Sequence, residues 1–399
     1  MVESARLMTT RTDDWLFGLA LATAATTLVS ITAAQSLLAL TILVWIALRP
    51  RRPVWPGFTL PMFAFMAITL ISLAASTDPS VGRGPVLKFV LFSMALVAAS
   101  FVTTTARLKL LAQALTIVAA VAATAGLAQF ASSYLQFSAT QAMADDPTLL
   151  DRSTGFMGHW MTYSGEQMLV WTGVLPLLWG LGVGRVRFVA ILIAAGLVFS
   201  FTRSVWIGAA LGATVAALYL PFRQVVRVLA PVLMIGLVAL PLIWHRIAAS
   251  FMEGGFAPDR GRIEMLQVGW GMVRDHPLFG VGPERVGTEF ERYYQGEHIE
   301  DLYTGHLHSN IVQIAAERGL PAAAILVWLL LKIGIDMVRG ARSSDPGVKW
   351  SSVSGLAVLV AFVAAGMFEF NFGDSEVLML FVFLVSVPYG MRSGAELGR

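Results

Sequence analysis

The chain has no cysteine, and only 13% of its 399 residues are charged. The absence of cysteine excludes disulfide bonds, thiolate nucleophiles and cysteine-ligated metal sites. Soluble domains usually carry about 25% charged residues, so this composition argues against a soluble fold. A formal net charge of +3 is too small to indicate nucleic acid as a partner. Gly-rich phosphate loops, Gly-x-Ser-x-Gly elbows and His-Glu-x-x-His motifs are also missing, which excludes the commonest nucleotide, ester and zinc chemistries.

Apolar residues are abundant instead, at 56% of the chain, and they fall in long continuous runs. Runs of about 17–22 residues are long enough to cross the hydrocarbon core as helices. Spanning barrels would show short alternating strands instead. The sequence therefore predicts an all-α polytopic membrane protein with about twelve transmembrane helices and no cleaved signal peptide. The predicted spans are 15–30, 32–48, 59–76, 86–104, 108–131, 165–183, 187–202, 204–220, 227–244, 320–338, 351–370 and 376–391.

The lysines and arginines between these spans are distributed unequally. Most of them fall on the side of the N-terminus, as in the cluster Arg49, Arg51 and Arg52. The positive-inside rule then places both termini in the cytoplasm. All six histidines and most acidic residues fall on the opposite, periplasmic side. Any chemistry of the chain is therefore expected at the periplasmic face.

One periplasmic loop, 245–319, is long enough to form a small subdomain. The predicted organisation is transmembrane helices 1–9 in 1–244, this loop, and transmembrane helices 10–12 with a short tail in 320–399. Apolar residues at helical spacing predict two amphipathic helices in the loop, at 262–274 and 284–295. Such helices are expected to lie on the membrane interface and cover the end of the bundle.

Arg203 stands in a very short polar link between two predicted spans, so it is held at the outer membrane surface. An arginine there is costly to desolvate and should face a polar cavity or a partner. Its guanidinium group suits a phosphate or pyrophosphate, which it binds as a fork. The alternative is an interfacial arginine that merely extends its head group to water.

Arg260 and Arg262 come just before the predicted start of the first loop helix. Arginines at this position oppose the preference of the helix dipole. Together with the free N–H groups of a helix N-terminus they would suit an anion. Solvated loop arginines are the alternative.

His306 and His308 form a His-x-His pair before another short helix, which is predicted to end at Gly319 before Pro321 begins the next span. Such a pair can chelate a metal, but no third ligand with useful spacing follows. A histidine here is otherwise a general base or a hydrogen-bond donor to phosphate. A histidine without function at the interface is the third alternative.

Acidic residues offer weaker candidates. The pairs Asp145-Asp146 and Glu300-Asp301 could bind Mg²⁺ or Mn²⁺, although adjacent acids in loops are usually only solvated. Glu166 and Glu369 lie near the outer ends of two predicted spans, where they could pair with the arginines.

Several short motifs occur together in 150–320. They are Arg152-Ser153-Thr154-Gly155, Thr202-Arg203-Ser204, Gly261-Arg262-Ile263-Glu264, Asp275-His276-Pro277-Leu278-Phe279-Gly280-Val281-Gly282-Pro283, His308-Ser309-Asn310 and Glu317-Arg318-Gly319-Leu320. This combination, with the long loop before the third-last span, resembles the bacterial O-antigen ligase and polymerase superfamily. The second histidine, His306, departs from the family pattern, and His308 is favoured because Ser-Asn follows it directly.

The resemblance implies a GT-C-like membrane glycosyltransferase whose donor is a glycan on undecaprenyl pyrophosphate. A ligase would use a sugar hydroxyl of lipid A-core as acceptor, in a metal-independent, inverting reaction with no cofactor. Arginines would bind the pyrophosphate, a histidine would act on the acceptor hydroxyl or the donor, and the apolar bundle would hold the polyprenyl chain. The implied catalytic residues are Arg203, Arg262 and His308, and the implied substrate-binding residues are Arg152, Glu166, Arg260 and His306.

Two classes of alternative remain open. An O-antigen polymerase or a protein O-oligosaccharyltransferase of the same superfamily would share the donor and differ in the acceptor. A transporter or lipid flippase is less favoured, because such proteins place ionisable groups or broken helices near mid-membrane. The predicted spans have almost none there.

Overall fold

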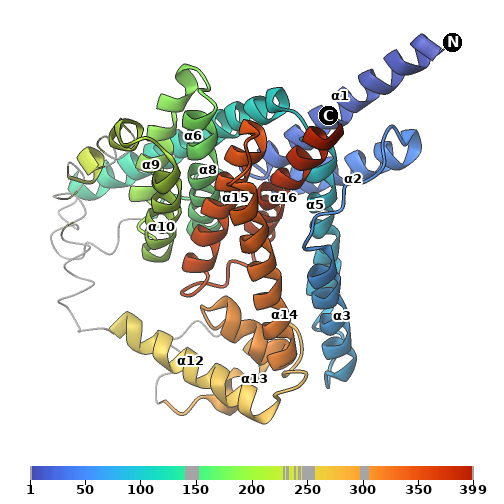
Figure 1. Cartoon of the computed structure of the whole chain (residues 1–399). Coiled ribbons are helices and arrows are strands. Elements are labelled where there is room, and N and C mark those ends of the chain that lie inside the picture. Colours follow the sequence, from blue (N-terminus) through green and yellow to red (C-terminus); the bar gives the residue numbers. More distant parts are fainter. Residues whose placement is uncertain are drawn as a thin grey trace.

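A computed structural model of the chain describes residues 2–139, 152–227, 257–296 and 305–397, with parts of 230–244. Within these residues every regular element is a helix (Figure 1). The helices are α1 (Val2–Thr26), α2 (Ile31–Leu48), α3 (Thr59–Ala75), α4 (Arg83–Leu87), η1 (Lys88–Phe92), α5 (Ser93–Phe101), α6 (Thr105–Ala139), α8 (Trp160–Gly180), η3 (Arg185–Phe188), α9 (Ala190–Val198), α10 (Arg203–Tyr219), α12 (Ala257–Asp275), α13 (Val286–Tyr293), α14 (Asn310–Gly340), α15 (Pro346–Ala365) and α16 (Ser375–Leu397).

Six helical stretches of the described residues are long and apolar enough to cross a membrane. They are Ile31–Leu48, Arg83–Phe101, Thr105–Gln136, Asn310–Gly340, Pro346–Ala365 and Ser375–Glu396. Three shorter apolar helices, Thr59–Ala75, Val186–Val198 and Arg203–Tyr219, also coincide with predicted spans. The all-helical class and the multi-pass membrane character are thus supported, whereas the number twelve stays a prediction.

The centre of the bundle is formed by α8, α15 and α16. Every residue of α8 from 163 to 179 is buried, so other parts of the protein surround this helix on all sides. α10 approaches α15 closely at Gly208 and Gly212, where an added Cβ would lie 2.7 and 2.8 Å from main-chain oxygens of α15. Small residues four apart permit such close helix contacts in membranes, where the hydrophobic effect does not drive association.

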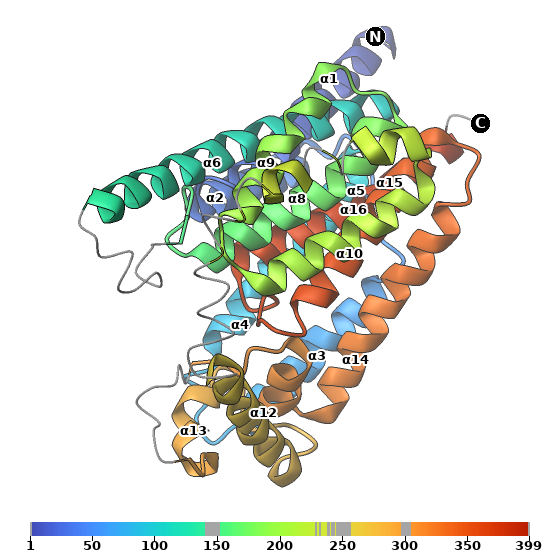
Figure 2. The same cartoon turned by 90° about the vertical axis from the view of Figure 1, so that its left-hand side faces the viewer.

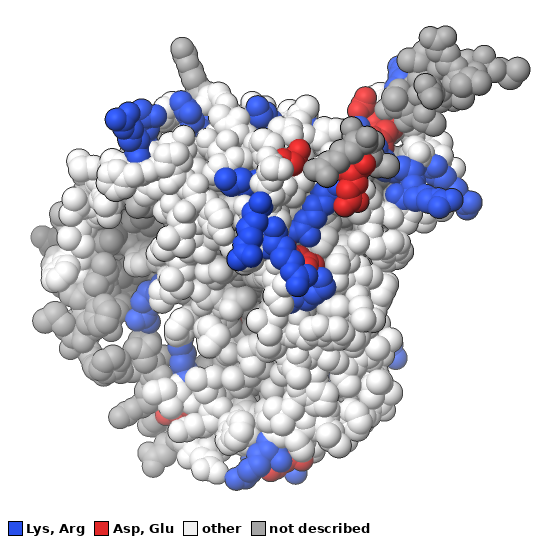
Figure 3. All heavy atoms as spheres, in the orientation of Figure 1, with Lys and Arg blue, Asp and Glu red and all other residues white. Residues whose placement is uncertain are grey.

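α12 and α13 lie together at one end of the bundle (Figure 2). α1 begins and α16 ends at the opposite end (Figure 1). On the face shown in Figure 3, a broad band of uncharged side chains separates the charged residues near α12 and α13 from those of the opposite end. This polarity fits a protein whose middle is embedded in hydrocarbon.

The two loop helices occur where the periodicity predicted them, but of the predicted apolar face of α12 only Val273 is buried. Met265, Val268 and Met272 are buried, whereas Ile263 and Trp270 of the predicted apolar face are 55% and 66% exposed. α12 therefore has apolar residues on two sides. The buried side packs toward α14, and the exposed side is suited to dip into the membrane interface.

The sequence motif at 276–283 forms a turn that is bound to the kink of α14. The N–H of Val281 donates to the carbonyl of Ala316 at 2.9 Å, and the N–H of Leu320 donates to the carbonyl of Pro277 at 2.8 Å. These bonds satisfy backbone groups that the kink removes from the helix ladder. The motif thus fixes the long loop to the start of the membrane-spanning part of α14.

Gly319 and Gly280 make this contact possible. Both have positive φ, +83° and +66°. A Cβ on Gly319 would overlap the carbonyl of Leu278, and a Cβ on Gly280 would overlap the backbone of Glu317. The short helix was predicted to end at Gly319, and the non-helical conformation of this residue confirms it.

Gly319→Ala is expected to destabilise the protein by roughly 1–3 kcal/mol, because alanine combines a left-handed backbone with a steric overlap. Thermal unfolding of the purified protein in detergent checks this. Gly334→Ala is the matched control, since Gly334 lies in the regular part of α14 and its Cβ would meet only a leucine methyl group at 3.3 Å. Equal melting temperatures for the two variants would contradict the assigned role of the turn.

Candidate active site

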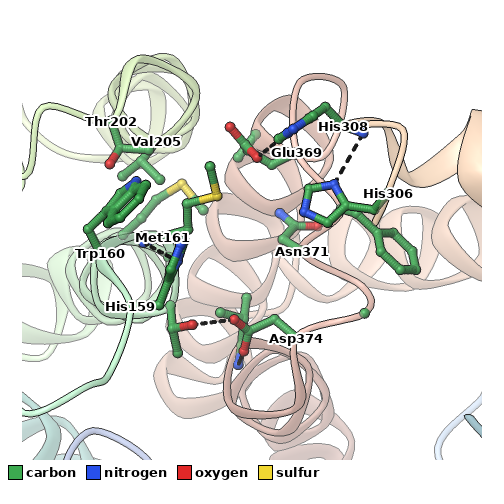
Figure 4. Close-up of a pocket in the computed structure, with 17 residues that line it drawn as sticks. His159, Trp160, Met161, Thr202, Val205, His306, His308, Glu369, Asn371 and Asp374 are labelled. Atoms are coloured by element: carbon green, nitrogen blue, oxygen red, sulfur yellow. Dashed lines mark hydrogen bonds and ion pairs between the residues drawn. The ribbon is translucent and has the colours of Figure 1, made fainter. Parts of the chain in front are cut away.

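A cavity of about 700 Å³ opens at the end of the bundle that carries α12 and α13. Its walls come from the start of α8, the start of α10, the loop before α14 and the α15–α16 connection (Figure 4). The lining includes His159, Trp160, Met161, Thr162, Thr202, Val205, His306, His308, Glu369, Asn371 and Asp374. Segments from four parts of the chain therefore meet around one space.

Glu369 is the centre of the polar wall. It is 7% exposed, and one carboxylate oxygen lies 3.0 Å from Nδ1 of His308. The other oxygen accepts a hydrogen bond from the guanidinium group of Arg262 at 3.2 Å. One buried carboxylate thus joins a histidine of the loop before α14 to an arginine of α12, so two of the three predicted catalytic residues contact a common partner.

The backbone holds His308 in an unusual conformation. Its φ is +48°, in the left-handed region that non-glycine residues rarely occupy. The preceding Leu307 is buried and donates its N–H to the side chain of Gln313 at 2.7 Å. Strained backbone of this kind persists where surrounding contacts fix it, and it is common at functional sites.

Arg152 and Arg203 lie next to lining residues of the cavity but, like Arg262, do not line it themselves. The guanidinium carbon of Arg152 lies 5.0 Å from the centre of the Trp160 ring. Burial lowers the pKa of Arg152, and the negative charge of Glu369 partly offsets this effect. The positive charges of Arg203 and Arg262 lower the pKa of Arg152 further, so the three arginines act on one another electrostatically. Guanidinium groups clustered in this way attract a multivalent anion.

Arg203 owes its position to a local break in the chain. Phe201 has a φ of +52°, and Thr202 precedes the first turn of α10 in an extended conformation. Thr202 itself lines the cavity, and its hydroxyl lies 3.2 Å from the hydroxyl of Ser164 on α8. Arg203 therefore lies at the first residue of an apolar helix, beside this cavity wall.

His306 also lines the cavity, with its ring 4.3 Å from the ring of His308. Burial lowers its pKa to about 4, aided by His308 and His159 and opposed by Glu369. His306 is consequently neutral at physiological pH. It is suited to hydrogen bonding with a substrate and unsuited to contributing a positive charge.

This pKa predicts an acid-sensitive stability. The unfolded chain gains a proton at His306 near pH 6.5, whereas the folded chain gains it only near pH 4. Between these values the unfolded state binds more protons, so stability is full above pH 6.5 and is lost as the pH falls toward 4. Melting temperatures measured at pH 7.5 and 4.5 should differ less, by a few degrees, in His306→Asn than in the parent protein.

His276→Asn supplies the control for that comparison, because His276 is an exposed histidine of the same loop. It should retain the acid sensitivity of the parent. The same slope in His306→Asn as in the parent would contradict the neutral, buried state of His306.

Two predicted substrate-binding residues have a different outcome. Glu166 is 1% exposed inside α8 and is not part of the cavity lining, so a role in binding substrate stays a prediction. The side chain of Arg260 lies outside the described residues. The predicted start of the first loop helix at 262 was wrong: α12 begins at Ala257, so Arg262 lies within the helix and contacts Glu369 through its side chain.

Asp374 lines the cavity but was not predicted as a site residue from the sequence. Asp374 accepts a hydrogen bond from Thr162 at 2.5 Å, and it also caps the start of α16 through the N–H groups of Glu376 and Val377. An acidic residue two or three positions before an apolar run does indicate a helix cap. Nothing in the sequence indicated the contact of Asp374 with Thr162 on α8.

Asn310, the last residue of the His-Ser-Asn motif, binds the α15–α16 connection to the start of α14. The side chain of Asn310 donates to Asn371 at 2.5 Å and accepts from the N–H of Phe372 at 3.0 Å. Its own N–H donates to the carbonyl of Gly366 at 2.8 Å. These bonds hold the α15–α16 connection, and with it Glu369, against the loop that carries His308.

A smaller cavity of about 240 Å³ adjoins the first. His306, Phe370 and Gly373 line both cavities. The small cavity also contains Lys88, which donates to the carbonyl of Gly373 at 2.6 Å. Aromatic side chains and charged groups together form its walls.

The described residues contain no group of three or more histidine or acidic side chains that could hold a metal ion. The acidic pairs Asp145-Asp146 and Glu300-Asp301, considered above as metal ligands, lie outside the described residues. The cationic groups around the cavity are suited to an anionic ligand instead.

Fold and site together define a helical membrane protein with a histidine-containing cavity at one end and a cluster of arginines beside it. Within this class, residues 188–327 match the family model described as O-antigen ligase. The match confirms the resemblance seen in the motifs and supports a member of the O-antigen ligase and polymerase superfamily, whose members are glycosyltransferase-like enzymes. It includes Arg203, Arg262 and His308. No curated protein matches the chain significantly.

Proposed function

We propose that the chain is an O-antigen ligase, which transfers a glycan from undecaprenyl pyrophosphate to a sugar hydroxyl of lipid A-core. The observation that supports this proposal is the clustering of Arg152, Arg203 and Arg262 near Glu369, which lines the cavity together with His308. A pyrophosphate leaving group needs positive charge, and fixed guanidinium groups in a poorly hydrated site supply it effectively.

The reaction is a direct displacement. The acceptor oxygen forms a bond to the anomeric carbon while the bond from that carbon to the pyrophosphate oxygen breaks. The pyrophosphate keeps the electron pair, and Arg203 and Arg262 bind the charge that develops. His308 takes the proton of the acceptor hydroxyl and later releases it to water. Attack opposite the leaving group inverts the anomeric centre.

Glu369 would prepare both partners for this reaction. If Nδ1–H of His308 donates to the carboxylate, Nε2 is left unprotonated as the base. The same carboxylate fixes the guanidinium group of Arg262, whose remaining N–H groups stay available for phosphate oxygens. Holding these groups before the substrate arrives reduces the cost of organising the transition state.

The two cavities suggest separate places for the two sugars. The larger one would hold the pyrophosphate and the first sugar of the donor. The smaller one has less volume than typical pockets for drug-sized ligands, about 300–1,000 Å³, so it would suit a single acceptor sugar. His306, which lines both, would contact the two sugars at their junction.

The proposed setting is the bacterial inner membrane, with both termini in the cytoplasm and the cavity facing the periplasm. The cavity opens at the end of the bundle that carries α12 and α13. The start of α1 and the end of α16 lie at the opposite end, which supports this orientation (Figure 1). We further propose twelve transmembrane spans, a GT-C-like architecture and a division of the chain into 1–244, 245–319 and 320–399. An O-antigen polymerase is the second candidate, since it would use the same donor site.

Transfer by the purified full-length protein tests the function. The donor is an undecaprenyl-pyrophosphate-linked glycan, and the acceptor is either rough lipopolysaccharide or a second lipid-linked glycan. We expect product on lipopolysaccharide, with the same rate in the presence and absence of EDTA. Product on the lipid-linked glycan alone would replace the ligase by a polymerase. A strict requirement for Mg²⁺ or Mn²⁺ would contradict charge stabilisation by arginines.

A further inference from the structure

A second large cleft lies far from the candidate active site, between α2 and α5. Its volume is about 910 Å³, and its lining comes from the last two turns of α2, the link 49–55 and the first half of α5. From this link, α3 runs to Ser72, whose hydroxyl donates to the carbonyl of Phe279 in the turn beside the active site. The cleft is therefore at the opposite end of the bundle, and no step of the proposed reaction uses it.

The cleft exists because the link is fixed while α2 packs loosely. Arg51 pairs with Asp13 at 2.5 Å and donates to the carbonyl of Ser100 at 2.5 Å, and the N–H of Val54 donates to the hydroxyl of Ser100 at 2.9 Å. Only 17% of α2 is buried inside the protein, and α2 projects beside α5 (Figure 1). In a bilayer, hydrocarbon chains must fill such a gap, because protein interiors do not tolerate large voids.

The walls and the rim of the cleft differ in chemistry. Ile42, Ile46, Leu96 and Val97 make the walls apolar, whereas arginines and tryptophans stand at the end of α2 and in the link. Trp45 and Trp55 line the cleft at this rim, where the amphipathic indole ring is typical of the membrane–water interface. The cleft is thus complementary to a lipid: its apolar walls suit an acyl chain, and its polar rim suits a head group.

Two of the rim arginines carry charge that the protein does not neutralise. Arg51 is engaged by Asp13, but Arg49 and Arg52 are exposed, and no carboxylate of the described residues forms an ion pair with either. Arg49 is held at the C-cap of α2 in a left-handed conformation, with its Nε donating to the carbonyl of Ile46 at 3.2 Å. Basic pockets between transmembrane helices are suited to anionic lipid head groups.

We infer that this cleft binds an anionic phospholipid of the surrounding membrane, with an acyl chain between α2 and α5 and the phosphate group at Arg49 and Arg52. The cleft is shallow enough to lie within one leaflet. From Ser93, the deepest lining residue of α5, to Ser100 at the level of the link, the helix rises roughly 10 Å. Half of a hydrocarbon core is roughly 15 Å.

Native mass spectrometry of the full-length protein tests this site with added phosphatidylglycerol and phosphatidylcholine. We expect phosphatidylglycerol to bind at least tenfold more tightly than phosphatidylcholine, and Arg49→Gln with Arg52→Gln to remove most of this preference. Arg339→Gln with Arg342→Gln is the matched control, since it removes the same charge from exposed residues outside the cleft. The control should bind phosphatidylglycerol like the parent.

A second variant tests the acyl-chain part of the site. Leu96→Trp places a large ring in the cleft and should weaken phosphatidylglycerol binding while leaving the arginines in place. Glycerol phosphate, which has the head-group charge without the chains, should not compete. Equal binding of both lipids, equal loss in the two arginine double variants, or competition by glycerol phosphate would each overturn the inference. These outcomes are independent of glycan transfer.

Discussion

Arg203→Ala is expected to lower the rate of glycan transfer by about 10²–10³-fold, the usual cost of removing one group that stabilises transition-state charge. Arg203 is the better choice than Arg262 for this test. Removing Arg262 would also take from the buried Glu369 one of its two partners, the arginine, which destabilises the fold itself. Initial rates with a lipid-linked donor and rough lipopolysaccharide measure the effect, and the melting temperature should stay close to that of the parent.

Two further variants separate the shape of the group from its charge. Arg203→Lys keeps the charge but loses the planar fork, so it should recover only part of the rate. Arg274→Ala removes an exposed arginine of α12 that pairs with the neighbouring Asp275, and it should leave the rate unchanged. Transfer at the parental rate by Arg203→Ala would remove this residue from the mechanism.

The sequence predicted the parts of this site that are local. Arg203 was predicted because an arginine between two apolar runs is held at the membrane surface, and His308 because a short motif surrounds it. The kink at Gly319 was predicted because a glycine followed by a proline ends a helix. Each of these inferences needs only residues within a few positions of one another.

The connections between these parts could not be predicted in the same way. His308 and Glu369 are 61 positions apart, and Arg262 and Glu369 are 107 apart. A hydropathy pattern does not distinguish one apolar span from another, so it does not predict which spans pack against each other in the bundle. Glu369 was therefore only one of two possible acidic partners, and the other, Glu166, lies buried inside α8.

Which side of α12 is buried could not be predicted from the sequence either. The 3–4 residue spacing of Ile263, Leu266 and Trp270 predicted the helix correctly, yet Ile263 and Trp270 are largely exposed. At a membrane surface both lipid and protein favour apolar residues, so an apolar stripe does not say which of the two it contacts. Only the packing of Met265 and Met272 distinguishes the inner side of the helix.

Glu369→Gln should have an effect comparable to that of losing the general base, about 10²–10⁴-fold in kcat. The amide can still accept a hydrogen bond from Arg262 through its oxygen. Toward His308 it presents an N–H₂ group, so Nδ1 must become the acceptor and the ring proton must move to Nε2. The nitrogen that should receive the proton of the acceptor hydroxyl is then already protonated.

The readout that distinguishes this role from a structural one is the position of the ring proton. ¹⁵N NMR of histidine-labelled protein, assigned with His308→Asn, should show the proton on Nδ1 in the parent and on Nε2 in Glu369→Gln. KM for the donor should change little, because the arginines remain. Glu289→Gln, which alters a carboxylate that pairs with Arg285 on α13, should affect neither kcat nor the NMR signal. A loss in Glu369→Gln that appears only in KM would mean that Glu369 serves Arg262 and the pyrophosphate, and not the tautomer of His308.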